Sequence, residues 1–272
     1  MRIAICIHGN LGSKKRGFER GNQLNKDELL IENNSNLYDP ILGYNNLKNL
    51  IDKYDTDVFC HCWNLDAKDK VVNLYKPKKY LFEEPKSFDV SLKDYNINTN
   101  EKDINKWNIN NIAKKGYKHY SYVRNHDFDK IIKELGCLSF RSSSRLYSLQ
   151  YSINLMNEYK NEQKINYDWI LICRFDNHWN FPRFKLTKTT NNKINYGEND
   201  VSQINLNLLN KEYIYGENDK DPSVRDLYLL ISDTNIKYFY NIYNERFNYC
   251  MRVPVYFNEI IQKTKHKKLI TL

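Results

Sequence analysis

Short, continuous runs of apolar residues separated by polar turns dominate the sequence. The clearest runs lie at residues 2–7, 57–64, 80–82 and 168–175. A continuous apolar run predicts a strand buried on both faces, as in a parallel sheet covered by helices on either side. Residues 226–232 are a further strand candidate, and residues 201–208 and 213–215 are weaker ones.

Between these runs the apolar residues have helical spacing. Leu47, Leu50 and Ile51 share one face of a predicted helix over residues 44–54. Apolar residues recur at three- and four-residue intervals over 140–162, and the three serines at 142–144 are expected to cap the start of this helix. Residues 235–247 and 255–262 predict two closing helices.

The order of these elements predicts an α/β fold, in which helices flank a twisted, mostly parallel sheet. No internal repeat or linker divides the chain, so we expect residues 1–272 to form one domain. Residues 87–125 are polar and lack a clear period, which indicates an insertion or long loop; a disordered segment is the alternative. A loop of this length is often a lid or a substrate loop.

Charge and cysteine content narrow the class of protein. The formal charge of +9 suits an anionic partner, although a lysine-rich soluble surface explains it equally well. Cys6, Cys60 and Cys173 sit inside apolar runs, which indicates buried free thiols in a reducing compartment. The apolar run at the start of the sequence is too short for a signal peptide. No segment has the ~20 apolar residues that a membrane-spanning helix needs. We therefore expect a cytoplasmic protein with at most peripheral membrane contact.

Polar residues follow the first strand directly. His8, Gly9 and Asn10 form a glycine-containing turn, and the basic residues Lys14, Lys15 and Arg16 come next. In an open α/β sheet, ligands bind at the carboxyl ends of the strands, where backbone N–H groups can hold a phosphate. The turn is therefore a candidate nucleotide-binding loop. An ordinary turn followed by a solvated basic segment is the alternative.

The second and fourth strands also end in candidate site residues. His61 and Trp63 lie two positions apart, so they share a face if the strand continues; Trp63 could stack on a base or sugar ring, and His61 could contact phosphate or act as an acid/base. A buried, hydrogen-bonded histidine beside a core tryptophan is the alternative. Cys60 and Cys62 flank His61, but alternate residues of a strand point to opposite faces, so we do not expect structural zinc. Arg174 ends the fourth strand and is a further candidate site residue. The alternative is that Arg174 and Asp176 form an ordinary surface ion pair.

Four blocks in consistent order resemble a family of glycosyltransferases found in bacterial surface-polysaccharide clusters and in some large viruses. The blocks are residues 2–9, residues 57–63 with a Phe-x-His-x-Trp element, residues 80–88, and the helix at 144–159 that leads into residues 167–176. The resemblance implies a GT-A-like (Rossmann-like) fold and a nucleotide-sugar donor. Arg174-Phe175-Asp176 would stand in place of the Asp-x-Asp motif, but with arginine first, so one carboxylate of that motif is missing. Many similar proteins also have a basic residue where this chain has Ile172.

The resemblance implies a glycosyltransferase that moves a sugar from its donor to a glycan or lipid-linked acceptor. Asp176 would then hold a divalent cation, Mn²⁺ or Mg²⁺, that bridges the diphosphate, and Arg174 could clamp a phosphate or a sugar oxygen. Glu259, which has a counterpart in similar proteins, and Asp226 are the candidates for a catalytic base, although either could be a plain surface carboxylate.

Two other functions remain open from the sequence. One is a basic nucleic-acid-binding protein, which the charge of +9 and the 22 tyrosines favour. However, the basic residues are dispersed and the sequence contains no nucleic-acid-binding motif, so we expect no nucleic-acid partner. The other is a degenerate transferase that binds a sugar nucleotide without chemistry.

Overall fold

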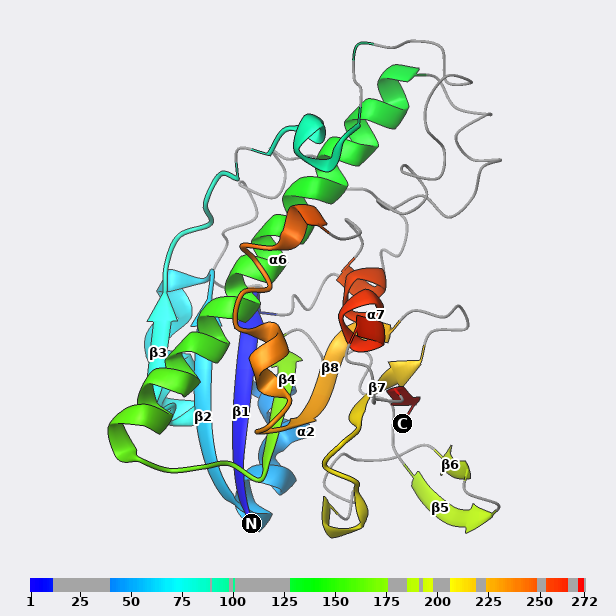
Figure 1. Cartoon of the computed structure of the whole chain (residues 1–272). Helices are drawn as coiled ribbons and strands as arrows, with labels where there is room; N and C mark the ends of the chain where they lie inside the picture. Colours follow the sequence, from blue (N-terminus) through cyan, green and yellow to red (C-terminus); the bar gives the residue numbers. More distant parts are fainter. Residues whose placement is uncertain are drawn as a thin grey trace.

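The structure is a computed structural model. It describes residues 1–11, 40–88, 90–97, 100, 128–175, 185–190, 193–197, 206–218, 224–248, 253–263 and 269–271. Within these residues, seven strands form one sheet in the order β3-β2-β1-β4-β8-β7-β9 (Figure 1). The strands are β1 (Arg2–Gly9), β2 (Asp55–Cys62), β3 (Lys79–Phe82), β4 (Trp169–Arg174), β7 (Ile214–Asn218), β8 (Val224–Ser232) and β9 (Leu269–Thr271). A separate hairpin pairs β5 (Lys185–Thr190) with β6 (Lys193–Gly197).

Most neighbours in the large sheet are parallel. β3, β2, β1 and β4 run in one direction, and β8 is antiparallel to both of its neighbours. β9 is parallel to β7. Residues Ile3 to Ile7 of the central strand β1 have no exposed surface, as expected for a strand covered on both faces. The predicted α/β class with a mostly parallel sheet flanked by helices is confirmed.

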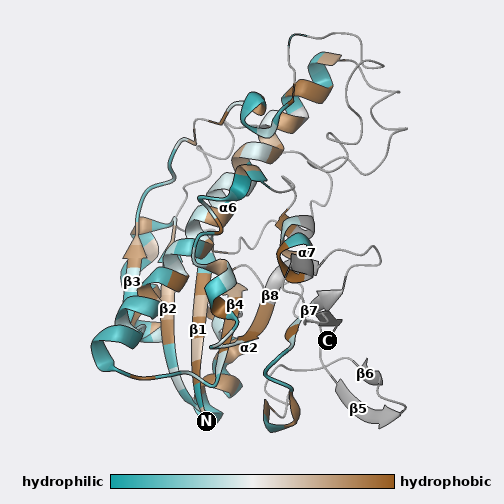
Figure 2. Ribbon diagram, in the orientation of Figure 1, coloured by the Kyte–Doolittle hydropathy of each residue, from teal (hydrophilic) through white to brown (hydrophobic). Residues whose placement is uncertain are grey.

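Each face of the sheet carries its own helices. Ile3, Ile5 and Ile7 belong to the apolar layer beneath α2 (Pro40–Lys53) and α3 (Lys68–Tyr75). Ala4 and Cys6, on alternate positions, belong to the layer beneath α6 (Phe128–Gln163) and α7 (Val253–Lys263). Figure 1 shows α6 crossing the sheet and α7 lying beside β8, and Figure 2 shows that the central strands are largely hydrophobic.

The connections between strands change face at the middle of the sheet. α2 joins β1 to β2 and α3 joins β2 to β3 on one face, whereas α6 precedes β4 on the other face. The chain therefore moves outward from β1 in one direction and returns at β4 in the other. In open α/β sheets such a switch point is where the crevice for a ligand forms, outside the carboxyl ends of the strands.

Several predicted elements are confirmed and others are wrong. The strands at 2–7, 57–64, 80–82 and 168–175 and the helices at 44–54 and 255–262 correspond to elements of the structure. The predicted strand candidates at 213–215 and 226–232 correspond to β7 and β8. The long helix, however, begins at Phe128 rather than near residue 140. The serines at 142–144 therefore lie inside it and do not cap it.

Two predictions in the second half of the chain are wrong. Leu206–Leu208 is a 3-10 turn (η7) rather than part of a strand; residues 201–205 lie outside the described residues. Residues 235–247 form the 3-10 turns η8 (Ile236–Phe239) and η9 (Arg246–Asn248) with turns between them. Two main-chain groups there bind side chains instead of continuing a helix: the N–H of Tyr243 donates to Gln150, and the carbonyl of Ile242 accepts from Tyr256.

The beginning of the expected insertion packs on the long helix. The 3-10 turn η3 (Leu92–Tyr95) has a capping box between Ser91 and Asp94. Leu92 and Tyr95 are buried against Ile131 of α6. Residues 98–99 and 101–127 lie outside the described residues. A further 3-10 turn, η2 (Leu65–Ala67), links β2 to α3.

The predicted free thiols agree with the structure. Among the described residues Cys6, Cys60, Cys62 and Cys173 are free and buried, and Cys137 is free and half-buried. Within the part of the chain that the structure describes, none of the helices combines the length and the apolar content that a membrane span requires.

Candidate functional site

Three predicted site residues form a row across the carboxyl ends of β2, β1 and β4. His8 is the register partner of His61 on one side and of Arg174 on the other. Register partners in neighbouring strands point to the same face, which here is the face covered by α6. The structure therefore brings His61, His8 and Arg174 together at the switch point of the sheet.

His61 is held by a chain of hydrogen bonds. Its Nδ1 lies 2.7 Å from the Ser148 hydroxyl of α6, and its Nε2 lies 2.9 Å from a carboxylate oxygen of Glu83. An ionised carboxylate can only accept, so Nε2 carries the proton and Nδ1 accepts from Ser148. The same hydroxyl accepts the N–H of Gly9 at 2.7 Å. Ser148 is fully buried, so this Ser–His–Glu chain positions the ends of three elements and does not present a nucleophile.

Burial and hydrogen bonding set the charge states of His61 and Glu83. It lowers the pKa of His61 more than Glu83 raises it, so the imidazole is neutral near pH 7. Burial works to raise the pKa of Glu83, but hydrogen bonds from Lys86 and His61 outweigh it and hold the pKa below its usual range. Lys86 Nζ lies 2.5 Å from the second Glu83 oxygen and 2.6 Å from the Tyr147 hydroxyl. The contact with Glu83 and the hydroxyl bond raise the pKa of Lys86.

Trp63 is buried among aromatic side chains. Its ring stacks on Tyr147, with centroids 5.4 Å apart, and meets His61 edge-on at 4.6 Å. Phe88 closes another edge at 6.1 Å. Only 3% of Trp63 is exposed, so its immediate neighbours are protein rings. This is the arrangement of the alternative interpretation, a buried histidine beside a core tryptophan.

His8 differs from its neighbour His61. It is buried, and its Nδ1 has no hydrogen-bond partner within the described part of the chain. Burial, followed by the charges of Arg174 and Arg145, holds the pKa of His8 well below its usual range. Buried polar atoms in native proteins nearly always have a partner, so an exception calls for an explanation such as a ligand. A neutral ring nitrogen that feels the charges of two arginines suits an oxygen-rich, anionic ligand.

The turn after β1 uses its own backbone donors. Gly9 has φ of +97°, a conformation that favours glycine, and a Cβ there would meet nothing within 4 Å. The N–H of Gly9 binds Ser148, and the N–H of Leu11 binds the Asn64 side chain at 2.9 Å. These two donors, which the sequence suggested for a phosphate, are engaged within the fold. Asn10 is exposed.

The structure does not describe three of the other predicted site residues. Lys14, Arg16 and Asp176 lie outside the described residues. Phe175, the residue before Asp176, donates its N–H to the carbonyl of His8 at 3.2 Å, so the chain leaves β4 at this edge. Among the described residues no group of three His, Cys, Asp or Glu side chains could hold a metal ion. The predicted Mn²⁺ or Mg²⁺ site therefore depends on Asp176.

The candidate bases lie on the opposite half of the sheet from β2 and β3. Glu259 is half-buried on α7, which packs over β8. Asp226 belongs to β8, and its side chain is outside the description. Their roles stay predictions.

Sequence reasoning missed Ser148, Glu83, Lys86, Tyr147 and Arg145. A signal existed for Glu83, because it directly follows the third strand, at the same edge as the other candidates. Ser148 offered a weaker signal as a polar residue beside the apolar positions of the long helix. Its partners are 87 and 139 residues away in the chain, a distance over which spacing predicts nothing.

Comparison of the chain with protein-family models, with curated proteins and with solved structures gives no match.

Proposed function

We propose that the chain is a glycosyltransferase that moves a sugar from a nucleotide-sugar donor to a glycan or lipid-linked acceptor. The observation that carries the proposal is His8 at the switch point of the sheet. It is buried, its Nδ1 has no hydrogen-bond partner within the described residues, and the charges of its register partner Arg174 and of Arg145 act on it. A diphosphate offers negative charge to the two guanidinium groups and oxygen atoms to the ring nitrogen of His8. The crevice outside such strand ends is also where nucleotides bind in open α/β sheets.

The topology supports a GT-A-like fold. If the strands of the large sheet are counted alone, β7, β8 and β9 become the fifth, sixth and seventh, and the spatial order is 3-2-1-4-6-5-7 with the sixth strand reversed. A mostly parallel sheet with one reversed strand is the kind of sheet that the GT-A-like (Rossmann-like) resemblance implies. It adds a structural argument to the resemblance of the four sequence blocks.

The proposed reaction forms a bond between an acceptor oxygen and the anomeric carbon of the sugar. The bond from that carbon to the phosphate oxygen breaks, the nucleotide diphosphate leaves with the electron pair, and the acceptor hydroxyl gives its proton to a base. Guanidinium groups aimed at the diphosphate stabilise the charge that develops on the leaving group. Arg174 and Arg145 are assigned this role, and His8 is assigned a hydrogen bond to a phosphate or sugar oxygen.

Two parts of the proposal come from the sequence alone. A divalent cation held by Asp176 would neutralise the diphosphate further. Glu259, or Asp226 in its place, would take the proton of the acceptor hydroxyl when the acceptor is bound.

Nucleotide titrations test the proposal. Calorimetry with UDP, GDP and dTDP and with their sugar conjugates should detect binding of at least one, followed by turnover. Arg145→Ala should weaken that binding about 10- to 150-fold, because a hydrogen bond to a charged group contributes about 1.5–3 kcal/mol. Arg141→Ala, on an exposed position one turn earlier on α6, is the control and should change little. No binding and no turnover across the panel, or salt-dependent binding of nucleic-acid single strands instead, would refute the assignment.

A further inference from the structure

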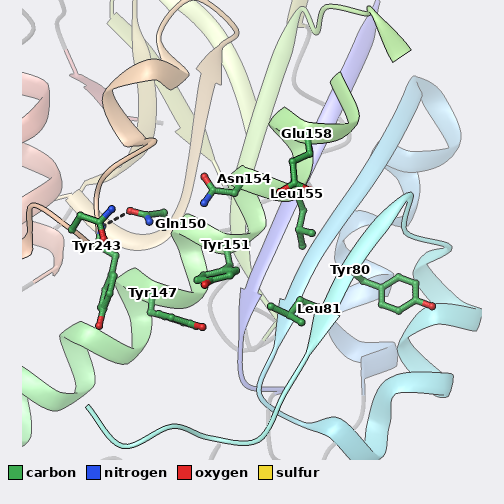
Figure 3. Close-up of a pocket in the computed structure, with 10 residues that line it drawn as sticks. Tyr80, Leu81, Tyr147, Gln150, Tyr151, Asn154, Leu155, Glu158 and Tyr243 are labelled. Atoms are coloured by element: carbon green, nitrogen blue, oxygen red, sulfur yellow. Dashed lines mark hydrogen bonds between the residues drawn. The ribbon is translucent and has the colours of Figure 1, made fainter. Parts of the chain in front are cut away.

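A hollow lies beside the histidine row, on the outer side of α6. It has a volume of about 430 Å³, within the ~300–1,000 Å³ typical of small-molecule sites. Three parts of the chain line it: α6, the edge strand β3 and the turn after η8 (Figure 3). The lining residues are Tyr80, Leu81, Tyr147, Gln150, Tyr151, Asn154, Leu155, Glu158, Tyr243 and Asn244.

The lining has a particular chemistry. It combines four tyrosine rings with three side-chain amides and two leucines. Among the described residues of the wall the single charged one is Glu158, which forms an ion pair with Lys79 at 3.3 Å. This described part of the wall therefore offers an ionic ligand no uncompensated charge. A ligand with apolar C–H faces and several hydroxyl groups matches rings and amides better than a nucleotide does.

We propose that this pocket binds a neutral saccharide, the acceptor glycan of the transfer. The identity of the saccharide as acceptor rests on the proposed function, whereas its binding does not. The pocket shares a wall with the strand-end site, because the ring of Tyr151 lies 5.7 Å from that of His61 and the ring of Tyr147 lies 5.6 Å from it. A glycan in the pocket would thus lie next to the end of β2.

The amides of the wall are available to hydroxyl groups. Gln150 accepts the N–H of Tyr243 through Oε1 at 2.9 Å, which fixes the orientation of its amide and leaves the NH₂ group as a donor (Figure 3). Asn154 follows one helical turn later. Within the described residues its amide makes no hydrogen bond, so it can both donate to and accept from a sugar hydroxyl.

Two of the four tyrosine rings of the pocket are held in place before any ligand binds. Tyr147 is fixed by Lys86 on its hydroxyl and by Trp63 on its ring. Tyr243 meets Tyr147 at right angles, with centroids 5.3 Å apart, and carries the guanidinium of Arg246 at 3.9 Å on its ring. Rings that are already ordered lose little side-chain entropy on binding, which favours affinity.

Ligand-observed NMR and calorimetry with neutral hexose oligosaccharides test this proposal, with a uronic-acid oligosaccharide as the charged comparison. The neutral ligands should bind, and the charged one should bind more weakly. Asn154→Ala should weaken the binding about two- to tenfold, the loss of one or two hydrogen bonds. Asn161→Ala, exposed on the same helix two turns later and outside the pocket, should leave it unchanged. Thermal unfolding of both variants confirms that they fold.

Titration of the same samples with the nucleotide panel separates the two proposals. Nucleotide binding without any saccharide binding overturns the pocket assignment alone, as does saccharide binding that both asparagine variants leave intact. Saccharide binding that is weakened only by Asn154→Ala, without nucleotide binding, supports the pocket and overturns the transferase.

Discussion

Ser148→Ala removes the hydroxyl that ties α6 to the ends of β1 and β2. The hydroxyl accepts the N–H of Gly9 at 2.7 Å and pairs with Nδ1 of His61 at 2.7 Å. Alanine leaves both groups without a partner, and each buried unsatisfied group costs about 1–3 kcal/mol. Because Gly9 is only half-buried, water can satisfy part of its loss. We therefore expect the free energy of unfolding to fall by about 2–4 kcal/mol, a large part of the ~5–15 kcal/mol of a typical protein.

Ser152→Ala is the matched control for this substitution. Ser152 lies one turn later on the same helix and is also fully buried, but its hydroxyl only donates to the carbonyl of Leu149 at 2.8 Å. That carbonyl belongs to the helix ladder, so its loss should cost less than about 1 kcal/mol. Urea unfolding followed by circular dichroism measures both variants, and thermal unfolding should place Ser148→Ala roughly 4–16 °C below the wild type. Equal destabilisation of the two variants would contradict the role of Ser148 as the link between these elements.

Two further predictions concern the ends of the strands and the helices that cover them. Gly43→Ala on α2 should destabilise the protein by about 1–3 kcal/mol, because the new Cβ would lie 2.7 Å from the carbonyl oxygen of Phe175. In the control Gly136→Ala on α6, the new Cβ meets nothing within 4 Å, so this variant should be more stable by about 0.5–1 kcal/mol. Urea unfolding that shows the same sign for both variants would contradict the packing of α2 on the end of β4. Burial and the charges of Arg174 and Arg145 lower the pKa of His8. Below the unfolded-state pKa of ~6.5, the unfolded chain therefore takes up a proton that the folded chain does not. The free energy of unfolding should then decrease as the pH decreases, by up to about 1.4 kcal/mol per pH unit. His8→Leu should flatten that slope in unfolding measurements between pH 6.5 and 5 and raise stability at pH 7 by about 1–3 kcal/mol, since it removes an unsatisfied buried nitrogen; an unchanged slope would show that His8 does not titrate in this way.

The sequence predicted the central strands well for a physical reason. β1, β2 and β4 are buried on both faces, so nearly every position in them is apolar and the pattern needs no knowledge of the rest of the chain. The helix predicted at 235–247 is wrong because contacts with distant residues decide the structure there. Its spacing is helical, but main-chain groups of Ile242 and Tyr243 bind side chains from α7 and α6, and such contacts are not visible in local spacing.

The candidate site was predictable only in part. The rule that ligands bind at strand ends was enough to select His8, His61 and Arg174, because each closes or nearly closes its strand. It could not distinguish one histidine from the other. Their difference comes from Ser148 and Glu83, which reach His61 from a helix and a loop, and from Arg145, whose charge acts on His8 from the same helix.

The two histidines at this edge of the sheet have contrasting surroundings. His61 and His8 are register partners, both are buried, and burial lowers the pKa of each. A fold selected only for stability would either give both rings partners or replace the unsatisfied one with an apolar residue, since that change removes a desolvation cost. The chain satisfies both nitrogens of His61 and uses it to fix the end of β2. On His8 it keeps a nitrogen that has no partner among the described residues and feels the charges of two arginines. A ligand that donates and accepts at that position would offset this cost, and only while it is bound. Under the proposed function, the edge therefore has a rigid half at β2 and a nucleotide-binding half at β1 and β4.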